Sequence, residues 1–464
     1  EISVDGQTYY KISNADQMRP FFMSLVSHSD HWMFISSTGG LSAGRIDSDH
    51  ALFPYYTDDK ITESYEYTGS KTLILVERED RRILWEPFST RYSGIYNIER
   101  NLYKNVYGNK LIFEEINHDL ALNFQYEWST SERFGFVRQA TLNSLASDNG
   151  NVSILDGIQN ILPYGVPAGL QSGSSNLVDA YKKCELEPGN LGIYALSAII
   201  SDKAEPSEAL KANVVWSLGL NAPKVLLSAK QIDAFRAGGD LETEFDVKAE
   251  RGAYFVSESF ELTAGGQKKW CMVANLSQGM SDVIALKEAL KKPEELYDEL
   301  AQDIEKGTQQ LITLIAASDG LQLTADRRRN IRHFANTMFN VMRGGIFDEN
   351  YKIDKADFMA YVDRANHKVF FKKEDQMTSW PEQFDLFFLQ NAAKKDEDLN
   401  FQRLCVEYLP LKFSRRHGDP SRPWNKFSIN LRNEDDGSKI LDYQGNWRDI
   451  FQNWEALAHA YPDF

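Results

Sequence analysis

The hydrophobic pattern of the chain changes its period near residue 281, and this change constrains the fold more than any other feature of the sequence. Before it, short runs of β-branched and aromatic residues are separated by turn signals such as Thr38-Gly39-Gly40 and Asp148-Asn149-Gly150. Many short strands with such turns and few helices between them are typical of a large antiparallel β-sandwich. After Ser281, apolar residues recur at every third or fourth position, as they do in amphipathic helices.

The pattern predicts strands over residues 31–35, 71–77, 111–113, 134–137, 213–218 and 254–262. A loop is predicted over residues 165–192, which are rich in Gly, Ser and Pro. One helix is predicted to begin at Ser281, with Ser281-Asp282 as its cap, and a second at Pro293. Further helices, separated by long polar loops, are predicted over residues 327–343, 383–393, 400–408 and 447–459.

These elements predict a multidomain protein with a β part and an α part. The chain has 464 residues, of which 42% are hydrophobic and 25% charged, a composition typical of two or three ordered domains. We expect a β-sandwich domain over residues 1–280, a helical linker over 281–325 and a helical domain over 326–464.

Several classes of function have no support in the sequence. The formal net charge of −16 argues against a nucleic-acid partner, because nucleic acids are themselves negatively charged. The longest nearly apolar run, Gly192 to Ile200, is too short to cross a membrane. The chain has no glycine-rich phosphate loop, no GxGxxG and no HExxH motif, so neither a nucleotide cofactor nor a metal is expected. No signal peptide is visible, which leaves the compartment open between cytoplasm and periplasm.

One segment late in the chain has a pattern suited to sugar chemistry. The run Gly445-Asn446-Trp447-Arg448-Asp449 leads into a predicted helix. A tryptophan face stacks on a pyranose and shields a nearby carboxyl from water, which raises the pKa of the carboxyl and lets it act as an acid. In this interpretation Asp449 is a candidate acid, and Trp447 and Arg448 are candidate substrate-binding residues. The alternative is that Asp449 caps the helix while Trp447, Phe451 and Trp454 pack in a core.

A second candidate segment lies upstream of this motif. Residues 415–425 form a predicted loop rich in Arg, His, Asp and Trp, and such loops on a helical scaffold often line a site. Arg416, Trp424 and Asn425 are its candidate substrate-binding residues, and the alternative is a solvated loop anchored by Trp424. Glu455, in the helix after the motif, is a further substrate-binding candidate.

Two weaker candidates are Gln376–Trp380 and Arg343-Gly344-Gly345. For both of them a structural role is the favoured interpretation.

The chain resembles a known family at several of these places. The run Gly445–Asp449 is similar to the Gly-Asp-Trp-Asn-Asp signature of the cellobiose and chitobiose phosphorylases, glycoside hydrolase family 94. Phe34–Gly40, Ala51–Tyr56 and Tyr254–Leu276 resemble parts of the β-domain with which that family begins. The order of parts is similar as well: a sandwich, linker helices, and then the helices of an (α/α)6 barrel.

The resemblance implies phosphorolysis of a glycosidic bond in a di- or oligosaccharide, with inversion at the anomeric carbon. The family's catalytic carboxyl falls on Asp449, which would protonate the leaving oxygen while inorganic phosphate attacks from the opposite face. Phosphate is then a co-substrate, and no cofactor is implied. Asn446 and Arg448 depart from the signature, and the charge of Arg448 would lower the pKa of Asp449.

The resemblance also implies that residues 326–464 are the N-terminal part of an (α/α)6-barrel catalytic domain. Twelve helices with their loops need roughly 190 residues, which is more than follow residue 325. We therefore expect a second polypeptide or a missing C-terminal segment to complete the barrel. Members of the family often dimerise through the β-domain, so a homodimer is consistent with the resemblance.

Two other functions fit the same residues. An inverting glycoside hydrolase would need a second carboxylate about 6.5–9.5 Å from the acid to activate water, and Glu455 is one candidate. A non-catalytic sugar-binding or assembly module would use the aromatic residues, 12% of the chain, to stack on sugars.

Overall fold

The computed structural model describes residues 1–464 except 79–80, 201–209, 413–426, 430, 434–435 and 442–449. The described residues form two compact units. The β-domain consists of residues 1–311, and the helical unit consists of the described residues from 312 to 464. The predicted boundaries at 280 and 325 fall at the start of helix α5 (Met280–Ala289) and directly before the residue that caps α7 (Arg327–Gly344).

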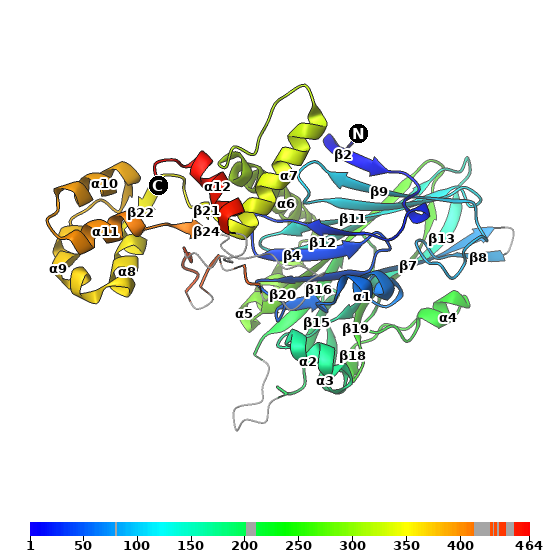
Figure 1. The fold of residues 1–464 in the computed structure, drawn as a ribbon. Helices are drawn as coiled ribbons and strands as arrows, with labels where there is room; N and C mark the ends of the chain where they lie inside the picture. Colours follow the sequence, from blue (N-terminus) through cyan, green and yellow to red (C-terminus); the bar gives the residue numbers. More distant parts are fainter. Residues whose placement is uncertain (79–80, 201–209, 413–426, 430, 434–435, 442–449) are drawn as a thin grey trace. The chain divides into compact units, whose positions relative to one another are not determined.

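The β-domain is built on antiparallel sheets, as the sequence predicts (Figure 1). Its largest sheet has the spatial order β1 (Ile2–Val4), β2 (Gln7–Ile12), β9 (Ile98–Asn105), β10 (Leu111–Asn117), β11 (Leu122–Ser131), β12 (Gly135–Ser144), β20 (Gln267–Gln278), β16 (Ala212–Leu218), β15 (Leu191–Leu196), β14 (Lys182–Glu187) and β18 (Asp246–Lys248). A second sheet has the order β17 (Lys224–Leu226), β19 (Gly252–Leu262), β13 (Gly150–Ile161), β7 (Gly69–Arg78) and β8 (Arg81–Trp85). A third has the order β3 (Phe22–Leu25), β4 (His31–Ser36), β5 (Leu41–Arg45) and β6 (Ala51–Phe53).

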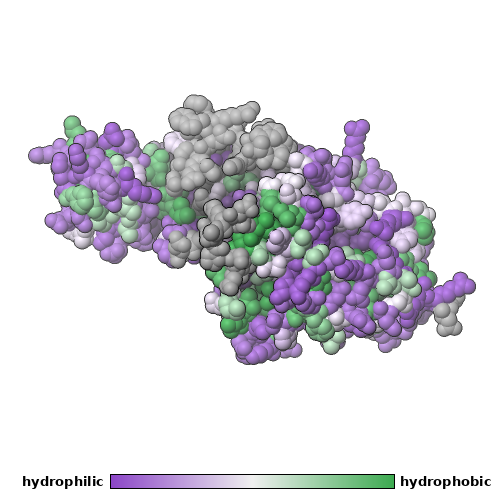
Figure 2. Space-filling view, turned by 90° about the horizontal axis from the view of Figure 1, so that it is seen from below, coloured by the Kyte–Doolittle hydropathy of each residue, from purple (hydrophilic) through white to green (hydrophobic). Residues whose placement is uncertain are grey.

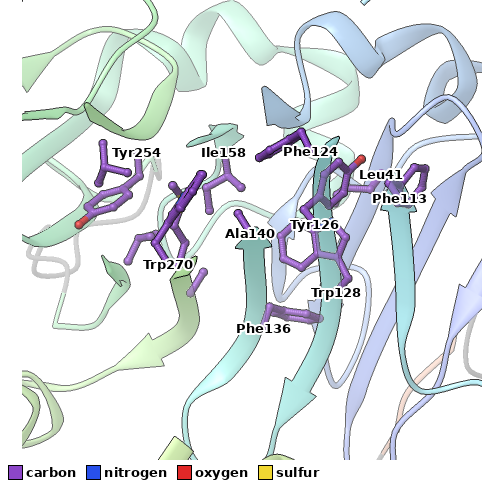
Figure 3. Close-up of a cluster of buried hydrophobic side chains, with 14 of the residues drawn as sticks. Leu41, Phe113, Phe124, Tyr126, Trp128, Phe136, Ala140, Ile158, Tyr254 and Trp270 are labelled. Atoms are coloured by element: carbon purple, nitrogen blue, oxygen red, sulfur yellow. The ribbon is translucent and has the colours of Figure 1, made fainter. Parts of the chain in front are cut away.

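One hydrophobic core joins the inner faces of these three sheets (Figure 3). Side chains alternate between the two faces of a strand, and on β11 the residues Phe124, Tyr126 and Trp128 all point into this core. Ile158 of the second sheet and Leu41 of the third pack in the same cluster. Burial of each of these large side chains stabilises the fold by about 1.5–3 kcal/mol, so the shared core holds the sheets together as a sandwich.

Helices cover the outer faces of two sheets. Leu290, which follows α5, and Leu296 of α6 (Pro293–Ala316) pack against Trp216 on the outer face of the large sheet. Phe235 of α4 (Ile232–Arg236) packs with Leu155 of β13 on the outer face of the second sheet. Three further short helices lie in connections: α1 (Asp58–Glu63), α2 (Ala168–Gly173) and α3 (Ser175–Tyr181).

Two details of the predicted elements are wrong. Residues 165–192 are not one loop, because they contain α2, α3 and β14; the turn-forming residues there separate short elements. The cap of α5 also lies earlier than predicted. Gly279 is the N-cap, and the Asp282 carboxylate accepts a hydrogen bond from its backbone N–H at 2.9 Å.

In the helical unit, α7 and α12 (Ile450–Ala460) pack against each other (Figure 1). The Asp326 side chain accepts hydrogen bonds from the backbone N–H groups of Arg328 and Arg329, which fixes the start of α7 at Arg327, as predicted. After α7 the chain enters β21 (Ile346–Phe347), which pairs antiparallel with β24 (Leu411–Lys412). Since these two strands pair, residues 348–410 leave and rejoin the unit at one place.

Residues 348–410 form a small helical lobe with its own core. Its elements are β22 (Lys352–Asp354), α8 (Lys355–Ala365), α9 (His367–Thr378), β23 (Gln383–Asp385), α10 (Leu386–Lys395) and α11 (Leu399–Glu407). Phe358, Val362 and Leu389 are fully buried in this core. Each of the four helices begins at an Asp or Asn whose side chain accepts a backbone hydrogen bond: Asp354, Asn366, Asp385 and Asp398.

The polar loop predicted before residue 383 is wrong, because helices α8 and α9 occupy much of it. Both helices are rich in charged residues, and only Phe358, Val362, Val369 and Met377 are buried along them. The face of the lobe seen in Figure 2 is correspondingly mainly hydrophilic. In the described ranges, the helices lack the combination of length and apolarity that a membrane span requires.

Candidate functional site

Most of the predicted sugar-binding and catalytic residues lie outside the described residues. These are Arg416, Trp424, Asn425, Trp447, Arg448 and Asp449. Glu455 is described: it lies on α12 with an exposed side chain, one residue after Trp454. The assignments of all seven therefore stay predictions.

Helix α12 contributes to an apolar pocket within the helical unit. The pocket encloses about 390 Å³ of empty space, including the space at its mouth, and is lined by Phe347, Leu409, Leu411, Trp454, Leu457, Ala458, Tyr461 and Phe464. The rings of Phe347 and Phe464 stack at 3.9 Å between centroids. Trp454, which the alternative interpretation of the motif assigns to a core, is thus part of an apolar wall.

The described residues that line this pocket offer apolar surface, the indole N–H of Trp454 and one hydroxyl. Tyr461 donates a hydrogen bond from its hydroxyl to Asn350 Oδ1 at 2.8 Å. Burial and the neighbouring Tyr351 raise the pKa of Tyr461 to about 12, so its hydroxyl keeps its proton near neutral pH. The lining residues include no carboxyl or imidazole, so they can cover an apolar ligand face but supply no acid or base.

A buried carboxylate, that of Asp348, lies at the base of the lobe. Its carboxylate accepts hydrogen bonds from Lys412 Nζ at 2.7 Å and from Lys439 Nζ at 2.9 Å. Its backbone N–H donates to the Pro410 carbonyl, which continues the β21–β24 pairing. Burial acts to raise the pKa of Asp348, but the hydrogen bonds and charges of the two lysines outweigh it and hold the pKa below its usual value. Asp348 thus ties the two ends of the lobe together.

The two weaker sequence candidates have structural roles. Trp380 follows α9 and stacks on Phe358 in the core of the lobe, with 5.8 Å between ring centroids. Gly345 ends α7 with φ at +83°, a conformation that favours glycine. Its backbone N–H donates to the Val341 carbonyl.

No group of three or more His, Cys, Asp or Glu side chains within the described ranges is placed to hold a metal ion. His28 and His31, three residues apart, point to different partners. His28 Nε2 lies 3.3 Å from Glu132 Oε2, whereas His31 Nδ1 lies 2.8 Å from Ser29 Oγ.

Curated proteins give no match to the chain. Among solved structures, it is similar to a bacterial glucoamylase in complex with acarbose, with 8% identity over 75% of this chain and 48% of that chain and a TM-score of 0.35. A protein from the human microbiome assigned as a kojibiose phosphorylase has 8% identity over 72% of this chain and 43% of that chain, with a TM-score of 0.35. An aldose epimerase homologue from C. elegans has 10% identity over 56% of this chain and 100% of that chain, with a TM-score of 0.32.

The chain spans less than half the length of the first two of these structures. A comparison with family models is more specific. Residues 347–410 match the model described as glycoside hydrolase family 149 insertion domain 1, and this range is the helical lobe with one flanking residue. The match does not confirm the narrower resemblance to family 94. It supports the broader expectation of a carbohydrate-active enzyme, because it links the lobe of this chain to the glycoside hydrolases.

Proposed function

We propose that this chain is part of a carbohydrate-active enzyme that cleaves a glycosidic bond of a di- or oligosaccharide by phosphorolysis, with inversion. The observation that carries the proposal is the match of residues 347–410 to an insertion domain of a glycoside hydrolase family. The match coincides with a lobe that has its own core and leaves the helical unit between paired strands. This is the arrangement expected of a domain inserted into a larger catalytic domain.

In this proposal, α7 and α12 are helices of an (α/α)6 barrel, and the lobe is inserted between them. Their mutual packing supports this assignment, since the helices that flank the insertion remain neighbours. A second polypeptide or a C-terminal continuation supplies the remaining helices. Asp449 directly precedes α12 in the sequence, so the proposed acid is adjacent to a barrel helix.

The proposed reaction needs one acid from the protein. Asp449 donates its proton to the glycosidic oxygen as the bond from that oxygen to the anomeric carbon breaks. A phosphate oxygen forms the new bond to the anomeric carbon from the opposite face, and the products are a sugar 1-phosphate and a shortened sugar. Asp449 then regains a proton from water. Trp447, Arg448, Trp424, Asn425, Arg416 and Glu455 are the proposed substrate-binding residues.

The test measures release of sugar 1-phosphate from a panel of disaccharides and short oligosaccharides, with and without inorganic phosphate. The purified chain is used together with any polypeptide that copurifies with it. We expect phosphate-dependent turnover that falls by about 100-fold or more in Asp449→Asn, the range in which general acids contribute. The matched control is Asp298→Asn, an exposed carboxyl on α6 whose loss leaves turnover unchanged.

Other outcomes identify the other functions. Release of free sugar without phosphate, abolished by Glu455→Gln as well as by Asp449→Asn, indicates an inverting hydrolase. Saturable oligosaccharide binding without turnover, unchanged in Asp449→Asn, indicates a binding module and overturns the proposal.

A further inference from the structure

One carboxylate in the helical unit binds lysines from two different segments of the chain. Asp348 accepts a hydrogen bond from Lys412 Nζ on one oxygen, at 2.7 Å, and from Lys439 Nζ on the other, at 2.9 Å. The Asp348 side chain is 8% exposed, whereas those of Lys412 and Lys439 are 28% and 59% exposed. The buried carboxylate is therefore the fixed point to which two partly exposed lysines bind.

Backbone hydrogen bonds fix Asp348 at the base of the lobe. The β21–β24 ladder pairs Phe347 with Leu411, and the Asp348 backbone N–H donates to the Pro410 carbonyl at 2.9 Å. These bonds already join the two ends of the lobe. The bond to Lys439, which belongs neither to the lobe nor to the ladder, therefore makes a further connection.

Lys439 lies on one arm of a short hairpin. Arg432 and Lys439 form an antiparallel bridge, and the Ile440 backbone N–H donates to the Leu431 carbonyl at 3.0 Å. Because the hairpin fixes the backbone of Lys439, the bond to Asp348 holds the hairpin at the base of the lobe.

Lys412 borders one of the two segments that contain the candidate site residues. It is the last residue of β24 and directly precedes residues 413–426, which contain the upstream group of substrate-binding candidates. Directly after this segment, Phe427 is buried. The bond from Lys412 to Asp348 thus fixes the residue at which the segment begins.

Lys439 lies shortly before the second of these segments. Residues 442–449 end at the proposed acid, Asp449, and α12 begins at the next residue. Helix α12 packs against α7. The hairpin of Lys439 and helix α12 therefore fix the described residues on the two sides of the segment with the proposed acid.

We propose that Asp348 is a positioning residue for the proposed cleavage of a glycosidic bond. Through Lys412 and Lys439 it holds the segment with the substrate-binding candidates and the segment with the acid in one arrangement. The inference rests on the proposed function. Such positioning matters because misplacement of a catalytic group by about 1 Å can lower a rate by about 100-fold.

The charges at this point make the arrangement depend on Asp348. Both ammonium groups lie within hydrogen-bond distance of one carboxyl group, so they repel each other once its charge is removed. Glu349 Oε1 lies 3.7 Å from Lys439 Nζ, but both of these side chains are 59% exposed, so this pair is a weak substitute. The pKa of Asp348 lies below its usual value, so its carboxylate stays charged near neutral pH.

Steady-state kinetics of phosphate-dependent sugar 1-phosphate release test the proposal, with cellobiose, maltose and laminaribiose as the probes. We expect Lys412→Gln to raise the KM for the sugar about tenfold, and Lys439→Gln to lower kcat about tenfold with little change in KM. Asp348→Asn should do both, and Asp348→Glu, which keeps the charge, should recover most of the loss. The matched control is Lys368→Gln, at an exposed position of α9, with unchanged kinetics expected.

Hydrogen exchange followed by mass spectrometry gives a readout that does not need turnover. Asp348→Asn should speed exchange in peptides from residues 413–426 and 442–449, and Lys412→Gln and Lys439→Gln should each do so in the adjoining segment only. Peptides from α10, in the core of the lobe, should exchange at the wild-type rate, because only a general loss of stability would speed exchange there.

The outcomes separate the two proposals. Absence of turnover in the wild type overturns the proposed function, and faster exchange confined to the two segments then still supports the role of Asp348. Unchanged kinetics in an active enzyme, or unchanged exchange, in Asp348→Asn overturns the inference. Exchange that rises equally in the two segments and in α10 shows a purely structural role and overturns it as well.

Discussion

Asp348 shows how one carboxylate stabilises the junction between the helical lobe and the rest of its unit. Replacing Asp348 with Asn removes the charge that Lys412 and Lys439 share. Both lysines are partly exposed, so solvent screening reduces the effect, and we expect a loss of about 1–2 kcal/mol near neutral pH. The pKa of Asp348 is lowered in the folded state, so this stabilisation is present above the usual value of 3.8 and is lost as the pH falls through the lowered value.

Urea unfolding of the wild type and Asp348→Asn, near neutral pH and in acid, checks this expectation. The difference in free energy of unfolding should shrink in acid. Asp375→Asn, an exposed carboxyl of α9, is the control with little effect at either pH. Equal stability of wild type and Asp348→Asn near neutral pH would contradict the assigned role.

At the scale of elements, the helical lobe begins and ends at one pair of neighbouring strands, so a short turn could replace it. Phe347 and Leu411 are direct partners in the β21–β24 ladder, and Asp348 bonds to Pro410 beside them. A two-residue Asn-Gly turn closes such a pair. We expect the chain with residues 349–409 replaced by Asn-Gly to fold, with the helical signal reduced by the loss of four helices.

Circular dichroism and thermal unfolding measure this outcome. The stack of Tyr351 on Phe464 and the bond from Tyr461 to Asn350 are lost with the lobe, so a lower unfolding midpoint for the helical unit is expected. A control with Gly-Gly in place of Asn-Gly tests whether the turn type matters. Aggregation of both shortened chains would show that the lobe is required for folding.

The prediction of elements succeeded where local pattern decides structure. The predicted strands at 31–35, 71–77 and 111–113 lie within β4, β7 and β10 because β-branched and aromatic residues are concentrated there. Helices α8 and α9 were missed, since their charged residues outweigh a narrow buried stripe that only the core of the lobe completes.

At the scale of the whole molecule, the described residues divide into two compact units. Phe136 is fully buried in the core of the β-domain, and Phe358 in the core of the lobe within the helical unit. Since these two side chains belong to different hydrophobic clusters, we expect two unfolding transitions in calorimetry. Phe136→Ala and Phe358→Ala should each cost about 3–5 kcal/mol, and each should lower the midpoint of one transition only.

The exposed ring of Phe387 offers a control for both variants. Phe387 is 68% exposed, so Phe387→Ala should leave both midpoints nearly unchanged. A single transition that moves in both core variants would show that the units unfold together.

The sequence by itself determined where strands give way to helices, because periods of two and of three to four residues are local properties of the chain. It also indicated carbohydrate chemistry, which the match of residues 347–410 supports. Only the tertiary structure decided which distant residues meet. Glu66, Phe88 and Tyr126 lie together because of the sheet register and the positive φ of Phe88. Lys439 donates a hydrogen bond to Asp348, although the four helices of the lobe separate the two residues in the sequence. Such contacts depend on how whole elements pack, which no local pattern of residues encodes.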